Sequence, residues 1–154
     1  MYRMNLGNRG DPFPIFHPSE VYMKEELDKL LCERYPKMFV NRDKSMQETA
    51  MCWGFECGSG WFELINALCA TIQNYIDNNS RPGKEIPQVT VDQVKEKYGT
   101  LRFYASGGDR LTDGMIWFAE SMSAHTCETC GHPGKWRGVG WFYTSCDEHA
   151  KDGE

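Results

Sequence analysis

The chain lacks several features that would place it quickly in a class of proteins. None of its apolar runs approaches the roughly 20 residues that a membrane-spanning helix needs. Its first nine residues are polar and hold no hydrophobic signal segment, so we expect a cytoplasmic protein with reduced cysteines. A formal charge of −5 and a pI near 5.4 leave no excess of positive charge, which argues against bulk binding of nucleic acid.

Sequence signatures of several enzyme classes are also missing. The chain has no H-E-x-x-H helix, no G-x-S-x-G turn and no phosphate-binding P-loop. No histidine is followed two residues later by glutamate, as the zinc deaminases require. Nothing in the sequence brings a nucleophile and a base together. We therefore predict no catalytic residue and favour a non-enzymatic role.

Four residues near the C-terminus have the spacing of metal ligands. Cys127, Cys130, Cys146 and His149 form the pattern C-x2-C-x15-C-x2-H. Zinc accepts thiolate and imidazole ligands in a tetrahedral shell, and two ligands separated by two residues can bind one ion from a single tight turn. The pattern predicts one zinc ion bound by all four residues. A shell closed by four protein ligands has no position for water, so its role would be structural.

The residues around these ligands predict a small local fold. Gly131 allows the chain to turn back after the first pair, as in a zinc knuckle. Aromatic residues around Gly138 and Gly140 indicate a β-hairpin, and the second pair resembles the first turn of a short helix. This order is typical of a treble-clef or ribbon-like zinc element. Two alternatives are ordinary buried thiols beside a surface histidine, and His132 as the fourth ligand.

Periodic patterns indicate three helices and one hairpin upstream of this element. Helical spacing is present over residues 19–34, with Ser19 as N-cap, and over 112–123, with Thr112 or Asp113 as N-cap. Between them, residues 58–60 open a second helix, which residues 78–83 end. The second helix carries one continuous apolar stripe: Trp61, Leu64, Ile65, Leu68, Ile72 and Ile76. In the third helix we expect four residues to face inward: Met115, Ile116, Ala119 and Met122. Alternation over residues 89–105 predicts a β-hairpin.

We therefore predict an α+β fold, with helices around a short antiparallel β-hairpin and a C-terminal treble-clef or ribbon-like zinc element. Residues 1–18 are rich in glycine and proline and would form an extended N-terminal arm. Residues 19–125 would form the α+β core, and residues 126–154 the zinc-finger element packed on it. The remaining cysteines would be small buried hydrophobes: Cys32, Cys52, Cys57 and Cys69. Alternatively, Cys52 and Cys57 could be half of a second metal site.

Four blocks of the chain together resemble a family. They are residues 51–62, 94–104, 119–131 and 140–150, and the similarity spans about residues 50–150. In combination they resemble small, uncharacterised zinc-finger proteins of tailed phages and prophages. The resemblance implies a phage source, and hence the host cytoplasm, together with a zinc site. It implies no activity.

Two places could bind an anion. Between residues 95 and 110, four basic residues outnumber two acidic ones: Lys95, Lys97, Arg102 and Arg110 against Glu96 and Asp109. Arg102 and Tyr104 would share one face of a strand and could address a phosphate, although a solvated strand face is the simpler interpretation. Ser59 and Gly60, at the start of the second helix, offer backbone N–H groups to an anion, or form a plain N-cap.

Three functional hypotheses follow. The first is a non-enzymatic binder of a small anionic, nucleotide-like ligand, which in a phage protein could sequester a host immune signal as counter-defence. The second is an adaptor whose zinc hairpin binds a host protein or nucleic acid through its aromatic and basic residues: Lys135, Trp136, Arg137, Trp141, Phe142 and Tyr143. Those aromatics could instead build the miniature core of the zinc element. The third is an enzyme acting on a nucleotide-like substrate. We expect no membrane partner, and the sequence predicts no oligomeric state.

Overall fold

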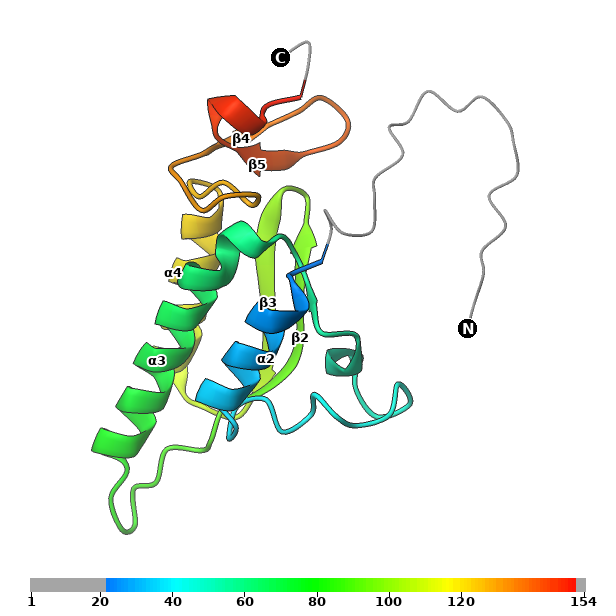
Figure 1. Cartoon of the computed structure of the whole chain (residues 1–154). Helices are drawn as coiled ribbons and strands as arrows, with labels where there is room; N and C mark the ends of the chain where they lie inside the picture. Colours follow the sequence, from blue (N-terminus) through cyan, green and yellow to red (C-terminus); the bar gives the residue numbers. More distant parts are fainter. Residues whose placement is uncertain (1–21, 152–154) are drawn as a thin grey trace.

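A small mixed sheet with helices around it forms the body of the protein (Figure 1). The computed structural model describes residues 22–151, so the predicted arm, residues 1–18, and Ser19 lie outside the described residues. Strand β1 (Phe55–Glu56) pairs parallel with β2 (Thr90–Lys97), and β2 pairs antiparallel with β3 (Thr100–Ser106). A separate C-terminal hairpin consists of β4 (Lys135–Arg137) and β5 (Tyr143–Ser145). The predicted α+β class is confirmed.

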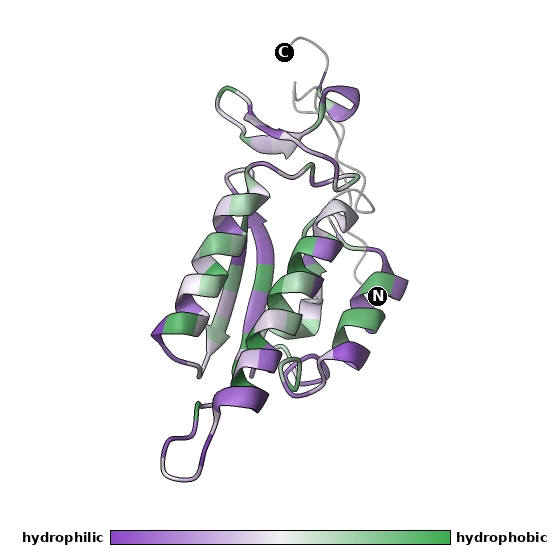
Figure 2. Ribbon diagram, turned by 90° about the vertical axis from the view of Figure 1, so that its left-hand side faces the viewer, coloured by the Kyte–Doolittle hydropathy of each residue, from purple (hydrophilic) through white to green (hydrophobic). Residues whose placement is uncertain are grey.

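Three helices surround the sheet: α2 (Glu25–Arg34), α3 (Phe62–Asn79) and α4 (Arg110–Ser123). Helices α2 and α3 lie over one face of the sheet, and α4 runs beside β3 (Figures 1 and 2). Three short 3-10 turns complete the described elements: Ala50–Trp53, Ser59–Trp61 and Asp147–His149.

The core lies between α3 and the inner face of the sheet. The predicted apolar stripe of α3 is buried, with Leu64 partly covered at its border. From the sheet, four side chains meet it: Val91, Val94, Leu101 and Phe103. Burying each such side chain stabilises the fold by about 1.5–3 kcal/mol, which is why α3 and the hairpin hold together.

The irregular segment over residues 36–54, whose structure the sequence pattern does not predict, is tied to α2 by a partly buried ion pair. Arg42 Nε lies 3.0 Å from Asp28 Oδ1, and its Nη2 lies 3.2 Å from Oδ2. The same guanidinium donates from Nη1 to the carbonyl of Cys52 at 3.0 Å. Gly54 has a φ of +76°, and a side chain there would overlap the Asp28 carboxylate. The Asp28–Arg42 ion pair therefore depends on a glycine at position 54, which leaves room for the Asp28 carboxylate.

The turn between β2 and β3 consists of two residues with left-handed backbones. Tyr98 has a φ of 55° and Gly99 a φ of 77°, the arrangement that matches the twist of a two-residue hairpin. The Glu96 carboxylate accepts a hydrogen bond from the Gly99 N–H at 2.5 Å. This turn points toward the C-terminal hairpin (Figure 1).

Two predicted helix starts are wrong. Residues 22–24 are not helical, because the Met23 N–H donates to the Phe55 carbonyl at 3.2 Å, and α2 begins only at Glu25. Helix α4 starts at Arg110, since Asp109 is its N-cap and accepts from the N–H groups of Leu111 and Thr112. Met122, predicted to face inward, is exposed.

Helix α4 supplies hydrogen bonds to the outer edge of β3. The Leu101 N–H donates to Ser123 Oγ at 2.8 Å, and the Phe103 N–H donates to Glu120 Oε1 at 2.9 Å. Two edge amides of the strand are thus satisfied by side chains rather than by another strand, and α4 is held along the edge.

We expect Ile72→Ala to lower the free energy of unfolding by about 2–5 kcal/mol, because it empties a fully buried position of α3. Asn74→Ala, on the exposed side of the same helix, should change stability by about 0.5 kcal/mol or less. Urea unfolding of both variants measures the difference. Equal stabilities would contradict the placement of the core.

Candidate metal centre

The first pair of candidate ligands lies in a tight turn directly after α4. The Gly131 N–H donates to the Cys127 carbonyl at 2.8 Å, and the Cys127 N–H donates to the His132 carbonyl at 2.8 Å. Gly131 has a φ of +78°, as predicted for the residue that turns the chain back. These bonds orient the thiols of Cys127 and Cys130 toward the same point.

The second pair comes from the end of β5 and the 3-10 turn that follows. Cys146 comes directly after β5, and His149 closes the turn Asp147–His149, its N–H donating to the Cys146 carbonyl at 3.2 Å. The predicted helical geometry of this pair is therefore present as one short turn. The hairpin β4–β5 carries this pair back over the knuckle (Figure 1).

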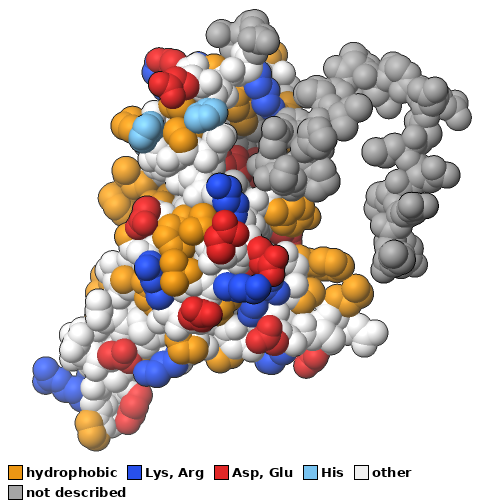
Figure 3. Space-filling view, in the orientation of Figure 1, with side chains coloured by type: hydrophobic (Ala, Val, Ile, Leu, Met, Phe, Trp, Pro, Cys, Tyr) orange, Lys and Arg blue, Asp and Glu red, His pale blue; other side chains and the backbone are white. Residues whose placement is uncertain are grey.

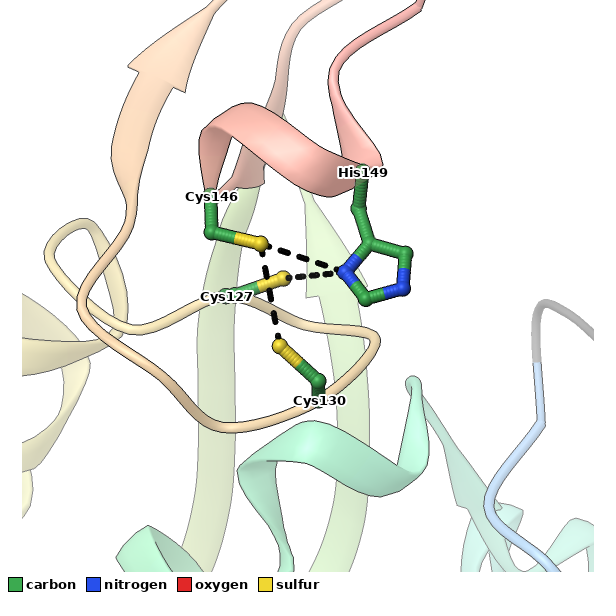
Figure 4. Close-up of side chains that lie close together, drawn as sticks. All are labelled: Cys127, Cys130, Cys146 and His149. Carbon is green, nitrogen blue, oxygen red and sulfur yellow. Dashed lines mark hydrogen bonds between the residues drawn. The ribbon is translucent and has the colours of Figure 1, made fainter.

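The four predicted ligands come together (Figure 4). One ligand atom from each of Cys127, Cys130, Cys146 and His149 lies within 4.8 Å of all the others. The Sγ atoms of Cys130 and Cys146 are 3.7 Å apart, and His149 Nδ1 lies 3.2 Å from Cys146 Sγ and 3.7 Å from Cys127 Sγ. A tetrahedron with zinc–sulfur bonds of about 2.3 Å has edges of about 3.8 Å. The cluster therefore fits a metal ion such as zinc.

The electrostatics of the thiols also fit a cation. Burial opposes ionisation of Cys127, but backbone N–H groups, among them those of Cys146 and Cys130, outweigh it and lower the pKa of this thiol to about 6. The His132 N–H favours ionisation of Cys130, yet burial and the neighbouring ligand sulfurs raise the pKa of that thiol to about 11. Sulfurs this close do not all ionise without a positive charge between them, and a divalent metal supplies it.

Glu128, between the first two ligands, joins the knuckle to the body. Its Oε1 accepts from the Gly58 N–H at 2.8 Å, and its backbone carbonyl accepts from the Gly60 N–H at 2.7 Å. Burial raises the pKa of this carboxyl to about 7, and the Gly58 N–H acts in the opposite direction. The Gly58 and Gly60 N–H groups, at the turn that opens α3, thus already donate to Glu128. Of the two residues predicted to bind an anion here, Gly60 has its N–H occupied in this way. The Ser59 hydroxyl accepts from the Lys24 N–H at 3.0 Å.

Three more hydrogen bonds join the zinc element to the body. Trp61 Nε1 donates to the Thr126 carbonyl at 2.8 Å. Thr144 Oγ1 donates to the Gly99 carbonyl at 2.6 Å, and Trp136 Nε1 donates to the Tyr98 carbonyl at 2.9 Å.

The bridging roles of these residues are not predictable from the sequence. A buried indole and a glutamate between two cysteines have no sequence pattern that reveals a partner about 70 residues away. The hydrogen bonds of Thr144 and Trp136 to the β2–β3 turn are likewise not predictable from the sequence, because each joins two segments that are far apart in the chain.

The predicted anion-binding residues of the hairpin share the outer face of β2 and β3, the face that carries Lys95, Lys97, Arg102 and Tyr104. Lys95 and Arg102 are directly opposite each other across the two strands. Lys95 Nζ lies 5.7 Å from the centroid of the Tyr104 ring. Arg102 Nη1 donates to Thr100 Oγ1 at 2.8 Å and to the Leu101 carbonyl at 2.7 Å, which fixes the guanidinium on the strand.

No second metal cluster with three or more ligands forms among residues 22–151. Cys57 and Cys69 are fully buried, and burial raises the pKa of both thiols well above its usual value. Cys52 is partly buried, and its Sγ lies 3.1 Å from the carbonyl of Thr49. Cys57 and Cys69 are thus packed in the core, while the metal-ligand geometry is confined to the C-terminal element.

Comparison with family models, with curated proteins and with solved structures finds no match to this chain. None of the described helices combines the length and the apolar character needed to cross a membrane.

We expect purified protein to contain one zinc ion per chain, and Cys130→Ser to lower the affinity for zinc by at least about 100-fold, because it removes one of four ligands. Elemental analysis after dialysis against a weak chelator measures the retained metal. Cys52→Ser is the matched control, since this cysteine lies outside the cluster, and should retain a full equivalent. Equal metal contents in both variants would rule out the proposed ligand set.

Gly60→Ala should destabilise the protein by about 2 kcal/mol or more, because the added methyl group would overlap the backbone of Cys127 and Glu128. Gly83→Ala is a useful comparison, since Gly83 has a φ of +78° and open space around it, and should show backbone strain alone, about 1–2 kcal/mol. Thermal unfolding of the zinc-loaded proteins gives both values. A Gly60 variant as stable as wild type would show that the knuckle does not pack on α3 this closely.

Proposed function

We propose that the protein is a zinc-stabilised, non-enzymatic binder of a small anionic, nucleotide-like ligand on the outer face of β2 and β3. The observation that carries the proposal is the direct cross-strand pairing of Lys95 with Arg102. Two cations side by side repel each other, and a bound anion would relieve this repulsion. The pair is notable in a protein with a net charge of −5.

The charges on this face are not balanced within the described part of the chain. No carboxylate there lies within 4 Å of Lys95, Lys97 or Arg102. Glu56, the neighbour of Lys95 on β1, accepts from Gln93 Nε2 at 3.4 Å and adds one negative charge beside the three cations. Both bonds of Arg102 use Nη1, so the N–H groups of Nε and Nη2 face no acceptor among the described residues and suit two oxygens of a phosphate.

Tyr104 gives the face a place for a planar group. Its side chain is 42% exposed and stands beside Arg102 on the same side of β3. A nucleobase can stack on a tyrosine ring while the phosphates reach the neighbouring cations. Guanidinium, ammonium and aromatic groups within one small face together favour a ligand that is both charged and aromatic.

This binding role agrees with a structural metal. The cluster supplies four protein ligands, the set that closes a zinc shell and leaves no coordination position for a reacting water. Combined with the resemblance to phage proteins, the proposed biological role is sequestration of a nucleotide signal of host immunity. An enzyme acting on such a nucleotide is the weaker alternative, because no base beside the cations is identified.

A second candidate function, an adaptor for a host protein or nucleic acid, is favoured by the tip of the zinc hairpin. Trp136 and Phe142 stack on each other, with their ring centroids 4.3 Å apart, while Val139 is 98% exposed and Trp141 65% exposed. On the face shown in Figure 3, basic and acidic side chains are mixed, which favours a protein partner over nucleic acid. Capture of a host protein that Trp141→Ser abolishes would establish this function instead.

We expect titration calorimetry with ATP, cyclic nucleotides and ADP-ribose to reveal a ligand, and Arg102→Ala to weaken its binding at least tenfold, about 1.4 kcal/mol. Lys84→Ala is the control, since Lys84 is exposed in a turn at the end of α3, and should bind normally. The zinc content of both variants should match wild type. No heat with any of these ligands would contradict the proposal.

A further inference from the structure

The outward face of α4 is apolar, although an amphipathic helix normally turns polar residues to solvent. Leu111 is 53% exposed, Phe118 69% and Met122 38%, and their spacing along the helix places them in one line. Trp117, next to this line, is 71% exposed. Figure 2 shows α4 at one side of the molecule, with the sheet and α3 on its inner side.

Beyond its first turn, where Arg110 and Asp113 are exposed, this face also carries no charge. Between Gly114 and Ala124, Glu120 is the one ionisable residue, and its carboxylate is directed inward to the Phe103 N–H at 2.9 Å. Exposed helix surfaces are usually rich in lysine and glutamate, which keep them in water. The outward face of α4 therefore resembles the side of a helix that packs on another element.

Gly114 carries no side chain on this face, and the gap that this leaves, here called the Gly114 hollow, has no cause among the described residues. Glycine within a helix is destabilising relative to alanine. Gly114 has no positive φ, and a Cβ added there would meet nothing within 4 Å. Neither backbone geometry nor packing within the described chain requires a glycine here. Phe118 is one turn further along the same face, so a hollow and a projecting ring lie side by side.

We propose that α4 packs antiparallel against α4 of a second copy of this chain, around a two-fold axis that crosses the outward face midway between Gly114 and Phe118. In this arrangement the Phe118 ring of each copy fills the Gly114 hollow of the other, because the two positions are equally distant from the axis. The same register sets Leu111 opposite the small residue Ser121. One surface thus provides both halves of a closed contact, as two-fold dimers require.

The occupant is a second copy because the face is complementary to itself in shape and, from Gly114 to Ala124, presents no outward charge that would repel a copy. Antiparallel helices also place their dipoles in opposite directions, which favours the pairing. Trp117 and Phe118 together expose on the order of 300 Å², because an aromatic side chain carries about 150–250 Å². A specific interface buries about 800 Å² per partner around a few aromatic anchors, so these rings would form its centre. The proposed dimer uses neither the metal ligands nor the outer face of β2 and β3.

Sedimentation equilibrium of the full-length, zinc-loaded protein tests the proposal. We expect a mass twice that of the 17.7 kDa chain, and a monomer for Phe118→Ser with unchanged circular dichroism and zinc content. Trp141→Ser, which removes an equally exposed aromatic from the zinc hairpin, should stay a dimer. A monomeric wild type, or a dimeric Phe118→Ser, would overturn the proposal.

A second variant examines the hollow itself. Gly114→Gln introduces a good helix former that fills the space meant for the partner's ring, so it should raise the thermal stability of the monomer while weakening the dimer at least tenfold. A Gly114→Gln protein that dimerises like wild type would overturn the register. This variant decides the question even if Phe118→Ser folds poorly.

Discussion

Three sulfurs and one imidazole held within 4.8 Å of one another are the constraint on which the C-terminal part of the molecule depends. Without a cation, neighbouring thiolates repel each other, and this repulsion destabilises the tight turn that brings them together. With a metal, the backbone of Cys127 and Glu128 is set in position, and Glu128 then pairs with the turn that opens α3. A metal bound there would thus fix a turn that is otherwise held mainly by backbone hydrogen bonds, among them the one from the Glu128 N–H to the Thr144 carbonyl of β5 at 3.1 Å.

The body and the zinc element share the β2–β3 turn. The carbonyls of Tyr98 and Gly99 accept from Trp136 and Thr144, so the end of the hairpin and the C-terminal strands hold each other. The outer face of β2 and β3 belongs to the same two strands. The C-terminal element therefore contacts the same two strands that carry the proposed ligand face, at the turn that joins them.

The features that were predictable from the sequence are those set by local spacing. The four ligands, the knuckle glycine, the stripe of α3 and the alternation of β2 and β3 each depend on residues close together in the chain. The features that were missed depend on distant partners. Asp109 was not recognised as the cap of α4, Asp28 and Arg42 pair across a segment without periodicity, and Glu128 bonds to Gly58. A charged residue whose partner lies elsewhere in the fold has the same local pattern as one that faces water.

Helix α4 has a further consequence for the sheet it borders. Its Ser123 and Glu120 side chains occupy the N–H groups of Leu101 and Phe103 on the outer edge of β3. Open strand edges recruit strands from other molecules and so start aggregation, and here such recruitment would first require the helix to move aside. In the folded protein, α4 therefore keeps this edge of β3 closed to the strands of other chains.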